Sequence, residues 1–397
     1  MPRCLTVMMV AHQRAVQRYL AVTKQPKAGP SPWKREWPLA LAVITLAAML
    51  LGKPLIAGML SHPVLVVTLL TTLCAVILAA AVSIVRHADI LAHRLGEPAG
   101  TLLLTLAVTG LEVAMVGFVM STGDEKPTLA RDTMFAVVML VLNGFMGMAL
   151  VLGGLRHNEQ GYNLKGANAF LVMIVPLTVL GLVLPNFTKS TPGPTLSTFQ
   201  MVFVSIMSIA IYSIFLFVQN RRYRGFFMEP EEARDDAASD VDHSHHSDRS
   251  TLYHSAMLGA YGLPLVMLAK QMSAPLDAIV MRLNAPIALG GFIMAVLVLT
   301  PESIAAIRAA RDNRLQRSVN VLLGSVLASI GLTIPLVIAI ALLTGRTLVL
   351  GLDAPDMVML ALTLFTSTLT FSLSRTNLLL GCVHLLLFAA FCMLLFD

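Results

Sequence analysis

Long apolar runs alternate with short polar segments along most of this 397-residue chain. Each run has about 20 residues, the length a helix needs to cross roughly 30 Å of hydrocarbon. We predict membrane-spanning helices at 38–59, 63–85, 98–121, 133–155, 167–187, 197–219, 253–271, 284–309, 317–344, 354–373 and 377–396. The predicted fold class is an all-α polytopic membrane protein with about 11 transmembrane helices.

Composition agrees with this pattern. Hydrophobic residues make up 56% of the chain and charged residues 13%, whereas soluble domains usually carry about 25% charged residues. The mean hydropathy is +0.78. A soluble fold would have too little polar surface to cover so much apolar side chain. The net charge of +6 is spread over short loops rather than gathered in one patch, so we expect membrane lipid as a partner and no nucleic acid.

The distribution of basic residues predicts the orientation. With the N-terminus inside, 7 of the 28 Lys and Arg residues fall in outer segments and the other 21 in inner ones. The outer ones are Lys53, Lys126, Arg131, Lys189, Lys270, Arg282 and Arg346. Cytoplasmic segments of membrane proteins carry such an excess. We therefore expect a bacterial inner-membrane protein with a cytoplasmic N-terminus.

One long polar segment divides the spans into halves. We predict a cytoplasmic tail (1–36), a first transmembrane helix (37–62), a five-helix repeat (63–219), an acidic and His-rich cytoplasmic loop (220–252) and a second five-helix repeat (253–397). The loop is interpreted either as a solvated linker or as a weak metal-gathering or regulatory segment. Repeats with an odd number of spans insert in opposite directions, as in many secondary transporters.

Two intramembrane carboxylates stand at corresponding places in the halves. Glu112 lies on the second span of the first repeat and Glu302 on the second span of the second repeat. A charge in lipid is costly, so such residues indicate a functional site. Pro301 lacks an N–H and leaves the Leu297 carbonyl without its helical partner. Further candidate oxygen ligands are Thr109, Thr300, Asn143 and Ser325.

Two acids in one water-accessible pocket predict a mechanism without covalent catalysis. Burial and mutual repulsion favour protonation, so each acid holds either a proton or a share of a cation. If only loaded states reorient, cations exchange for protons. The chain has no phosphate-binding loop, nucleophile elbow or HExxH helix. We expect a secondary transporter rather than an enzyme, with no cofactor and with Glu112 and Glu302 contacting the transported metal ion.

The stretch from Glu302 through Val321-Leu-Leu-Gly324-Ser325 to Pro335 resembles the second repeat of calcium/proton exchangers in the cation/calcium antiporter superfamily. The GLEVAMV and LVLGGLRHNEQGYNLKGANA stretches of the first half resemble the ChaA-type subgroup. The wider family usually has Gly-Asn four and three residues before each acid, where this chain has Val108-Thr109 and Val298-Leu299. The resemblance implies exchange of Ca²⁺, with Na⁺ and K⁺ as further ions, for protons.

The leading hypothesis is therefore an antiporter that expels cytoplasmic Ca²⁺, and in a broader form Na⁺ or K⁺, in exchange for external protons. The first alternative is a monovalent Na⁺/K⁺ proton antiporter with little calcium transport. A passive cation channel shares buried acids but usually obtains its pore from oligomeric symmetry. An intramembrane enzyme would need a nucleophile or metal cluster near Glu302. A membrane sensor built around the acidic loop would lose its function when that loop is deleted.

Overall fold

The computed structural model describes residues 36–95, 99–122, 127–228, 250–283, 286 and 288–396. Most of the predicted tail and the acidic stretch of the predicted loop lie outside these residues. The helices of the first half are α3 (Trp37–Leu51), α4 (Lys53–Leu60), α5 (Pro63–Leu95), α6 (Ala99–Thr122), α7 (Leu129–Met139), α8 (Met146–His157), α9 (Leu164–Thr178) and α10 (Thr198–Phe217). Short helical turns follow or join them: η1 (Leu140–Phe145), η2 (Val179–Val183), η3 (Leu184–Asn186), η4 (Val218–Arg222) and η5 (Arg224–Phe227).

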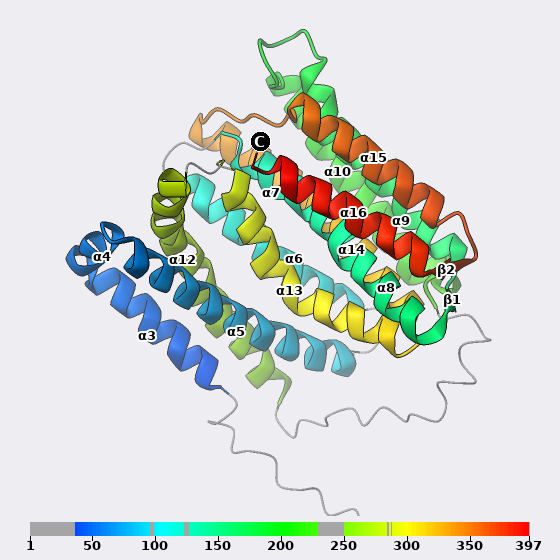
Figure 1. Cartoon of the computed structure of the whole chain (residues 1–397), viewed down its shortest axis with the longest axis horizontal. Helices are drawn as coiled ribbons and strands as arrows, with labels where there is room; N and C mark the ends of the chain where they lie inside the picture. The colour runs from blue at the N-terminus through cyan, green and yellow to red at the C-terminus, as the bar shows by residue number, and fades with distance from the viewer. Residues whose placement is uncertain are drawn as a thin grey trace, which may run out of the picture.

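The second half is simpler (Figure 1). Its helices are α12 (Thr251–Leu283), α13 (Ala288–Arg311), α14 (Leu315–Thr344), α15 (Ala354–Thr370) and α16 (Leu378–Leu394). Strand β1 (Glu159–Gly161) pairs antiparallel with β2 (Arg375–Asn377), which joins the ends of α8 and α16. This small sheet is absent from the predicted pattern, because three-residue strands leave no periodic signal.

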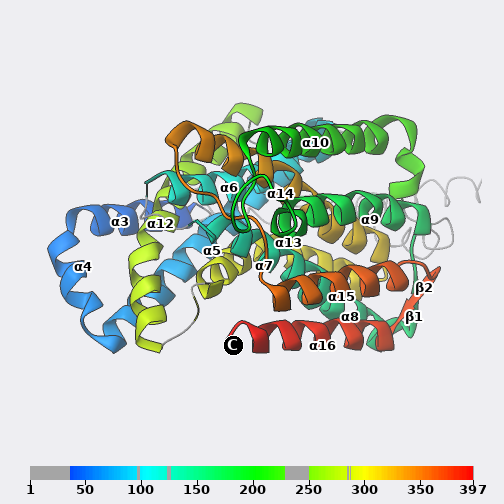
Figure 2. The same ribbon diagram turned by 90° about the horizontal axis from the view of Figure 1, so that it is seen from above.

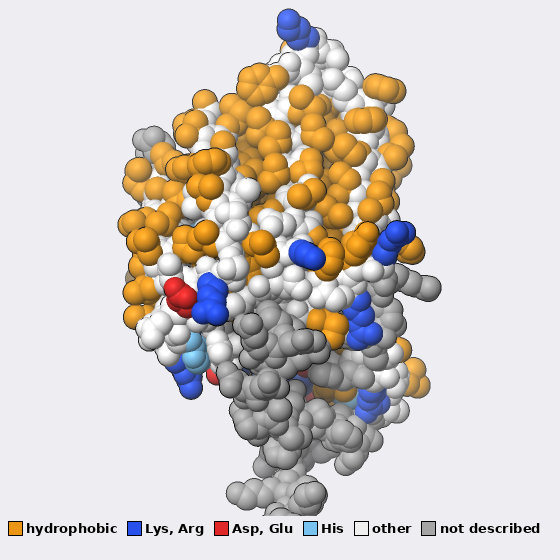
Figure 3. All heavy atoms as spheres, turned by 90° about the vertical axis from the view of Figure 1, so that its right-hand side faces the viewer, with side chains coloured by type: hydrophobic (Ala, Val, Ile, Leu, Met, Phe, Trp, Pro, Cys, Tyr) orange, Lys and Arg blue, Asp and Glu red, His pale blue; other side chains and the backbone are white. Residues whose placement is uncertain are grey.

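Each predicted span coincides with a helix or helix pair, so the all-α polytopic fold is confirmed. Seven described helices are long and apolar enough to cross a membrane, eight if α3 and α4 form one span. Part of α6, together with α15 and α16, forms shorter apolar helices. Figure 3 shows a broad band of hydrophobic side chains on one face, with Lys and Arg side chains near its lower edge. An apolar belt of this kind suits a lipid environment.

Three predicted spans have different shapes in the structure. The first is bent by 85° between α3 and α4, where Gly52 precedes Lys53-Pro54 and a proline ring clashes with the carbonyl four residues earlier. The second continues to Leu95 and the seventh to Leu283. Pro264 and Pro275 lie inside α12 without ending it, because neighbouring helices can satisfy freed backbone groups in membranes.

The helices pack reciprocally between the halves. Helix α6 packs against α14, while α13 packs against α7 and α8. Helix α10 lies against α14, and α16 lies against α8. The long helices α5 and α12, the first of each half, pack against each other. Inverted repeats produce such exchanged partners, and the exchange brings α6 and α13 to the middle of the molecule.

Two hydrophobic cores divide the bundle. The larger core is built by α7 to α10 and α14 to α16 together with parts of α6 and α13. The smaller one joins α3, α5 and α12 to Met115 of α6 and to Met294, Leu297 and Val298 of α13. Figure 2 shows α3, α4, α5 and α12 grouped on one side of the remaining helices. Helices α6 and α13 therefore stand at the boundary between the two groups.

A polar cluster holds the group of α3, α5 and α12 together at one end. The Glu36 carboxylate accepts hydrogen bonds from Arg86 Nη2 at 2.9 Å and Tyr261 OH at 2.8 Å. His87 Nε2 lies 3.3 Å from the same carboxylate, and its Nδ1 lies 2.8 Å from Nδ1 of His254. Burial alone would raise the pKa of Glu36, but the bond from Tyr261 and the charge of Arg86 hold that pKa below its ordinary value.

Candidate functional site

Glu112 occupies the middle of α6, where it faces α14. Its side chain is only 4% exposed, and its Oε2 accepts a hydrogen bond from the Ser329 hydroxyl. Helix α6 approaches α14 closely at Gly117, where an added Cβ would stand 3.0 Å from the side chains of Leu336 and Ile340. A buried carboxylate requires such a donor, since an unpaired one would lose all its hydration.

Glu302 holds the corresponding place on α13. It is half-buried, and its Oε1 accepts a hydrogen bond from the Ser325 hydroxyl. Helix α13 passes through Pro301 without ending, so the missing N–H leaves the Leu297 carbonyl free of its helical bond. A carboxylate and a released carbonyl therefore occur within about one turn of each other on this helix.

A single helix brings the two acids together. Ser325 and Ser329 are four residues apart on α14, so they share one face and are separated by about 6 Å along the axis. Because each serine bonds one of the acids, Glu112 and Glu302 lie within one helical turn of each other along α14. The charge of Glu112 also acts on Glu302. The site is thus formed by α6, α13 and α14, with at least one contribution from each half.

The two candidate threonines lie near the acids but make different contacts. Thr109 is 3% exposed and precedes Glu112 by three residues, so it shares the same face of α6. The Thr300 hydroxyl donates to the Val296 carbonyl of its own helix at 2.5 Å. That local bond occupies the hydroxyl proton, while the lone pairs of the oxygen stay available for a cation.

Asn143 belongs to another buried network. It lies in the π-helical turn η1, which packs against α13, α14 and α16. Its Nδ2 donates to Thr363 Oγ1 at 2.8 Å, and its Oδ1 lies 3.1 Å from His384 Nδ1. His384 Nε2 in turn lies 3.0 Å from Thr370 Oγ1. These contacts tie η1 to α15 and α16, and they point the amide toward that side of the core.

Ser329 was missing from the predicted set of ligands, because serine is ordinary packing material between membrane helices. Its spacing of four residues from Ser325 was the available signal, since both fall on one face of a helix. Within the described ranges, no three His, Cys, Asp or Glu side chains come together as a metal site. The oxygens gathered between α6, α13 and α14 are carboxylate and hydroxyl oxygens, which suit hard cations.

Known proteins resemble the chain over nearly its whole length. A model of the sodium/calcium exchanger protein family matches residues 64–220 and 254–396. The protein y4hA of Sinorhizobium fredii is 42% identical over 359 residues, which cover 90% of this chain and 95% of that protein. The sodium-potassium/proton antiporter ChaA of Escherichia coli is 41% identical over 321 residues, covering 81% and 86% of the two chains.

Solved structures with the same fold include those of two exchangers. Native YfkE superposes with a TM-score of 0.68 at 16% identity and covers 90% of this chain and 99% of its own. The H⁺/Ca²⁺ exchanger CAX gives a TM-score of 0.61 at 16% identity, with 91% and 88% coverage. At such low identity the likeness concerns the fold.

Proposed function

Because the chain belongs to the sodium/calcium exchanger family, we propose that it is a cation/proton antiporter that expels cytoplasmic Ca²⁺, and also Na⁺ or K⁺, in exchange for external protons. The observation that carries the proposal is the pair of acids from opposite halves, each bonded to a serine of one helix. Glu112 and Glu302 are the residues that bind the cation and the protons in turn.

The mechanism follows from competition at one site. A cation binds the two ionised carboxylates, and protons neutralise the same oxygens. A cation and a full set of protons therefore cannot occupy the site at the same time. Ser325 and Ser329 orient the carboxylates, while Thr109, Thr300 and the Leu297 carbonyl are further oxygens on the helices that carry them. An empty pair of carboxylates is disfavoured in a low-dielectric interior, so reorientation accompanies a loaded site.

The proposed arrangement in the membrane retains the expected division of the chain. The tail (1–36) and the loop (220–252) are cytoplasmic, the segment 37–62 precedes the repeats, and the two repeats are 63–219 and 253–397. The family match omits residues 221–253 and thus breaks at the proposed loop. With a cytoplasmic N-terminus in a bacterial inner membrane, α6 ends and α13 begins on the outer side.

A second candidate is a monovalent Na⁺/K⁺ proton antiporter with little calcium transport. It is favoured by the 41% identity to a protein described as a sodium-potassium/proton antiporter. Where the wider family usually has asparagine amides, this chain has the hydroxyl of Thr109 and the apolar side chain of Leu299. Fewer strong oxygen ligands reduce the advantage of Ca²⁺, which takes six to eight of them.

Transport in everted membrane vesicles tests both candidates. Addition of Ca²⁺, Na⁺ or K⁺ to acid-loaded vesicles should release protons, and Glu112→Gln and Glu302→Gln should each abolish that release. Glu159→Gln is a matched control, because Glu159 lies in the exposed sheet with its side chain 57% exposed. Exchange retained in both site variants would overturn the assignment. Cation flux that a pH gradient cannot drive uphill would instead indicate a channel.

A further inference from the structure

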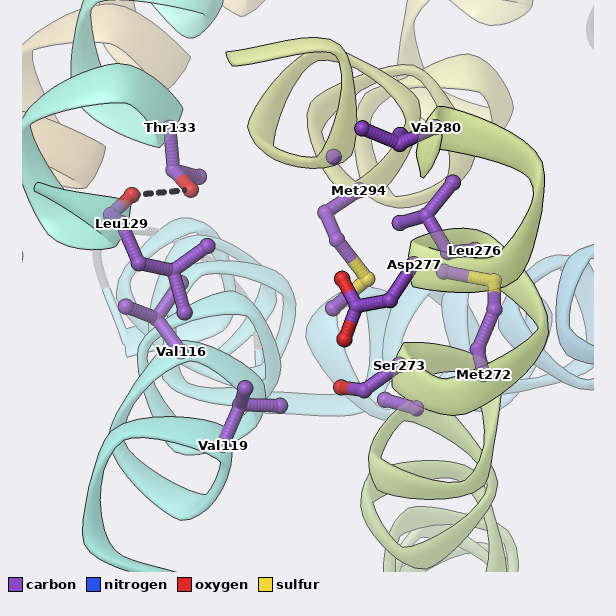
Figure 4. A pocket seen from close by; sticks show the side chains of 12 residues that line it. Val116, Val119, Leu129, Thr133, Met272, Ser273, Leu276, Asp277, Val280 and Met294 are labelled. Atoms are coloured by element: carbon purple, nitrogen blue, oxygen red, sulfur yellow. Dashed lines mark hydrogen bonds between the residues drawn. The ribbon is translucent and has the colours of Figure 1, made fainter. Parts of the chain in front are cut away.

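A pocket lies between α12 and the helices that carry the acids (Figure 4). Its walls are formed by α6, α7, α12 and α13 and are mostly apolar, with Val116, Leu276 and Met294 among them. The polar lining residues are Thr133, Ser273 and Asp277. In Figure 4, Asp277 and Ser273 point from α12 into the space that faces Val116 and Val119 of α6. The one carboxylate in this lining thus faces the helix that bears Glu112.

The pocket lies to one side of the two acids along α6 and α13. Val116 follows Glu112 by four residues, so the wall at α6 begins about 6 Å from Glu112 along the helix axis. Met294 precedes Glu302 by eight residues, about 12 Å along α13. Both positions lie toward the end of α6 and the start of α13. In the proposed orientation these ends face the outer side of the membrane.

Asp277 is well placed to influence ions in this space. It is half-buried, and the walls around it are mostly hydrocarbon. A carboxylate in a cleft with low-dielectric walls concentrates cations, since the field is focused rather than screened. The hydroxyls of Ser273 and Thr133 add oxygens on opposite walls, although the Thr133 hydroxyl donates to the Leu129 carbonyl at 2.8 Å.

We propose that this pocket is the outer vestibule of the transport site and that Asp277 draws cations and protons into it. The inference rests on the proposed antiport for its direction of transport. It assigns a function to a residue outside the pair of acids. It also predicts that the face of α12 carrying Ser273 and Asp277 is reached by water-soluble reagents from the outer side.

Accessibility can be tested without any transport activity. Ser273→Cys is introduced into a chain whose native Cys4, Cys74, Cys382 and Cys392 are replaced by alanine. A membrane-impermeant maleimide should label it in right-side-out vesicles much faster than in everted ones. Labelling only in everted vesicles, or in neither, would overturn the vestibule. This readout stays informative even if the antiport assignment fails.

The role of Asp277 is tested by ionic strength. Ca²⁺ uptake into acid-loaded right-side-out vesicles should show a half-saturating concentration about 3- to 10-fold higher for Asp277→Asn at low salt, and the gap should close near 0.5 M choline chloride. Asp277→Glu should restore the wild-type value. Asp353→Asn is the matched control, because Asp353 is a 71%-exposed carboxylate outside the pocket. A salt-independent loss, or equal effects of Asp277→Asn and Asp353→Asn, would overturn the role of Asp277.

Discussion

Replacing Ser325 or Ser329 by alanine tests whether α14 takes part in ion binding. Each hydroxyl donates to one carboxylate in the structure. Hydrogen bonds to charged groups contribute about 1.5–3 kcal/mol. In the proposed mechanism a cation binds the ionised carboxylates, so removal of a donor weakens that state and also removes a hydroxyl oxygen. The half-saturating cation concentration should rise about 10- to 150-fold in each variant, since 1.4 kcal/mol is tenfold.

The assay is cation-driven proton release from everted vesicles, measured over a wide range of Ca²⁺, Na⁺ and K⁺ concentrations. Ser318→Ala is the matched control. Ser318 lies on the same helix and is fully buried, and its hydroxyl has no hydrogen-bond partner among the described residues. Its replacement should change the half-saturating concentration less than about twofold, because no bond to a charge is lost.

The double variant Ser325→Ala/Ser329→Ala gives a second measure. If the two carboxylates share one ion, the two losses are coupled, and the double effect should differ from the product of the single effects. The reasoning fails if both single variants bind ions as well as Ser318→Ala while the amount of folded protein is unchanged. In that case the serines would only pack α14 against α6 and α13.

Two further predictions concern stability, followed as thermal unfolding in detergent. Glu36→Gln should lower the free energy of unfolding by about 1–2 kcal/mol at pH 7. Glu159→Gln, which removes one partner of an exposed ion pair, should lower it far less. Because the pKa of Glu36 is lowered in the folded state, the stability advantage of the wild type over Glu36→Gln should shrink as the pH falls below about 4.3. An advantage that grows toward low pH would contradict this sign. Gly381→Ala should lower the free energy of unfolding by about 1–3 kcal/mol, because the added Cβ would stand 2.7 Å from the Val151 nitrogen. Gly110→Ala has open space around it and should leave the stability unchanged. Equal melting points of the two variants would refute this packing argument.

The sequence reveals the spans and the two acids because both signals are local. A run of apolar residues indicates a membrane span, and a lone carboxylate such as Glu112 or Glu302 stands out within apolar sequence. Their pairing could also be inferred, since five spans in each half relate the two positions. The length of α12 could not be read in the same way. Proline usually breaks helices in soluble proteins, but in the structure α12 continues past Pro264 to Leu283.

Contacts between distant segments were harder to predict. Asn143 looks like a ligand because an amide is unusual in an apolar run, yet its bonds reach Thr363 and His384, 220 and 241 residues away. Asn143 reaches these partners only because η1 packs against α16 in the folded chain. Ser329 shows the opposite case, in which an ordinary residue gains importance from the acid opposite it. Type and spacing locate a site, whereas the detailed partners depend on tertiary packing.

In the proposed antiport, the charge of the site limits the exchange that it can support. Two carboxylates carry two negative charges when ionised, and one Ca²⁺ or two protons neutralise them. One Na⁺ or K⁺ together with one retained proton gives the same result. Every loaded state is then neutral, so exchange of one Ca²⁺ for two protons should move no net charge. A membrane potential of 100 mV shifts the movement of one charge by about 2.3 kcal/mol, or roughly 50-fold in equilibrium. Ca²⁺ accumulation ratios measured at 0 and 100 mV should therefore agree within about twofold, and a difference near 50-fold would show that another charged group accompanies the ion.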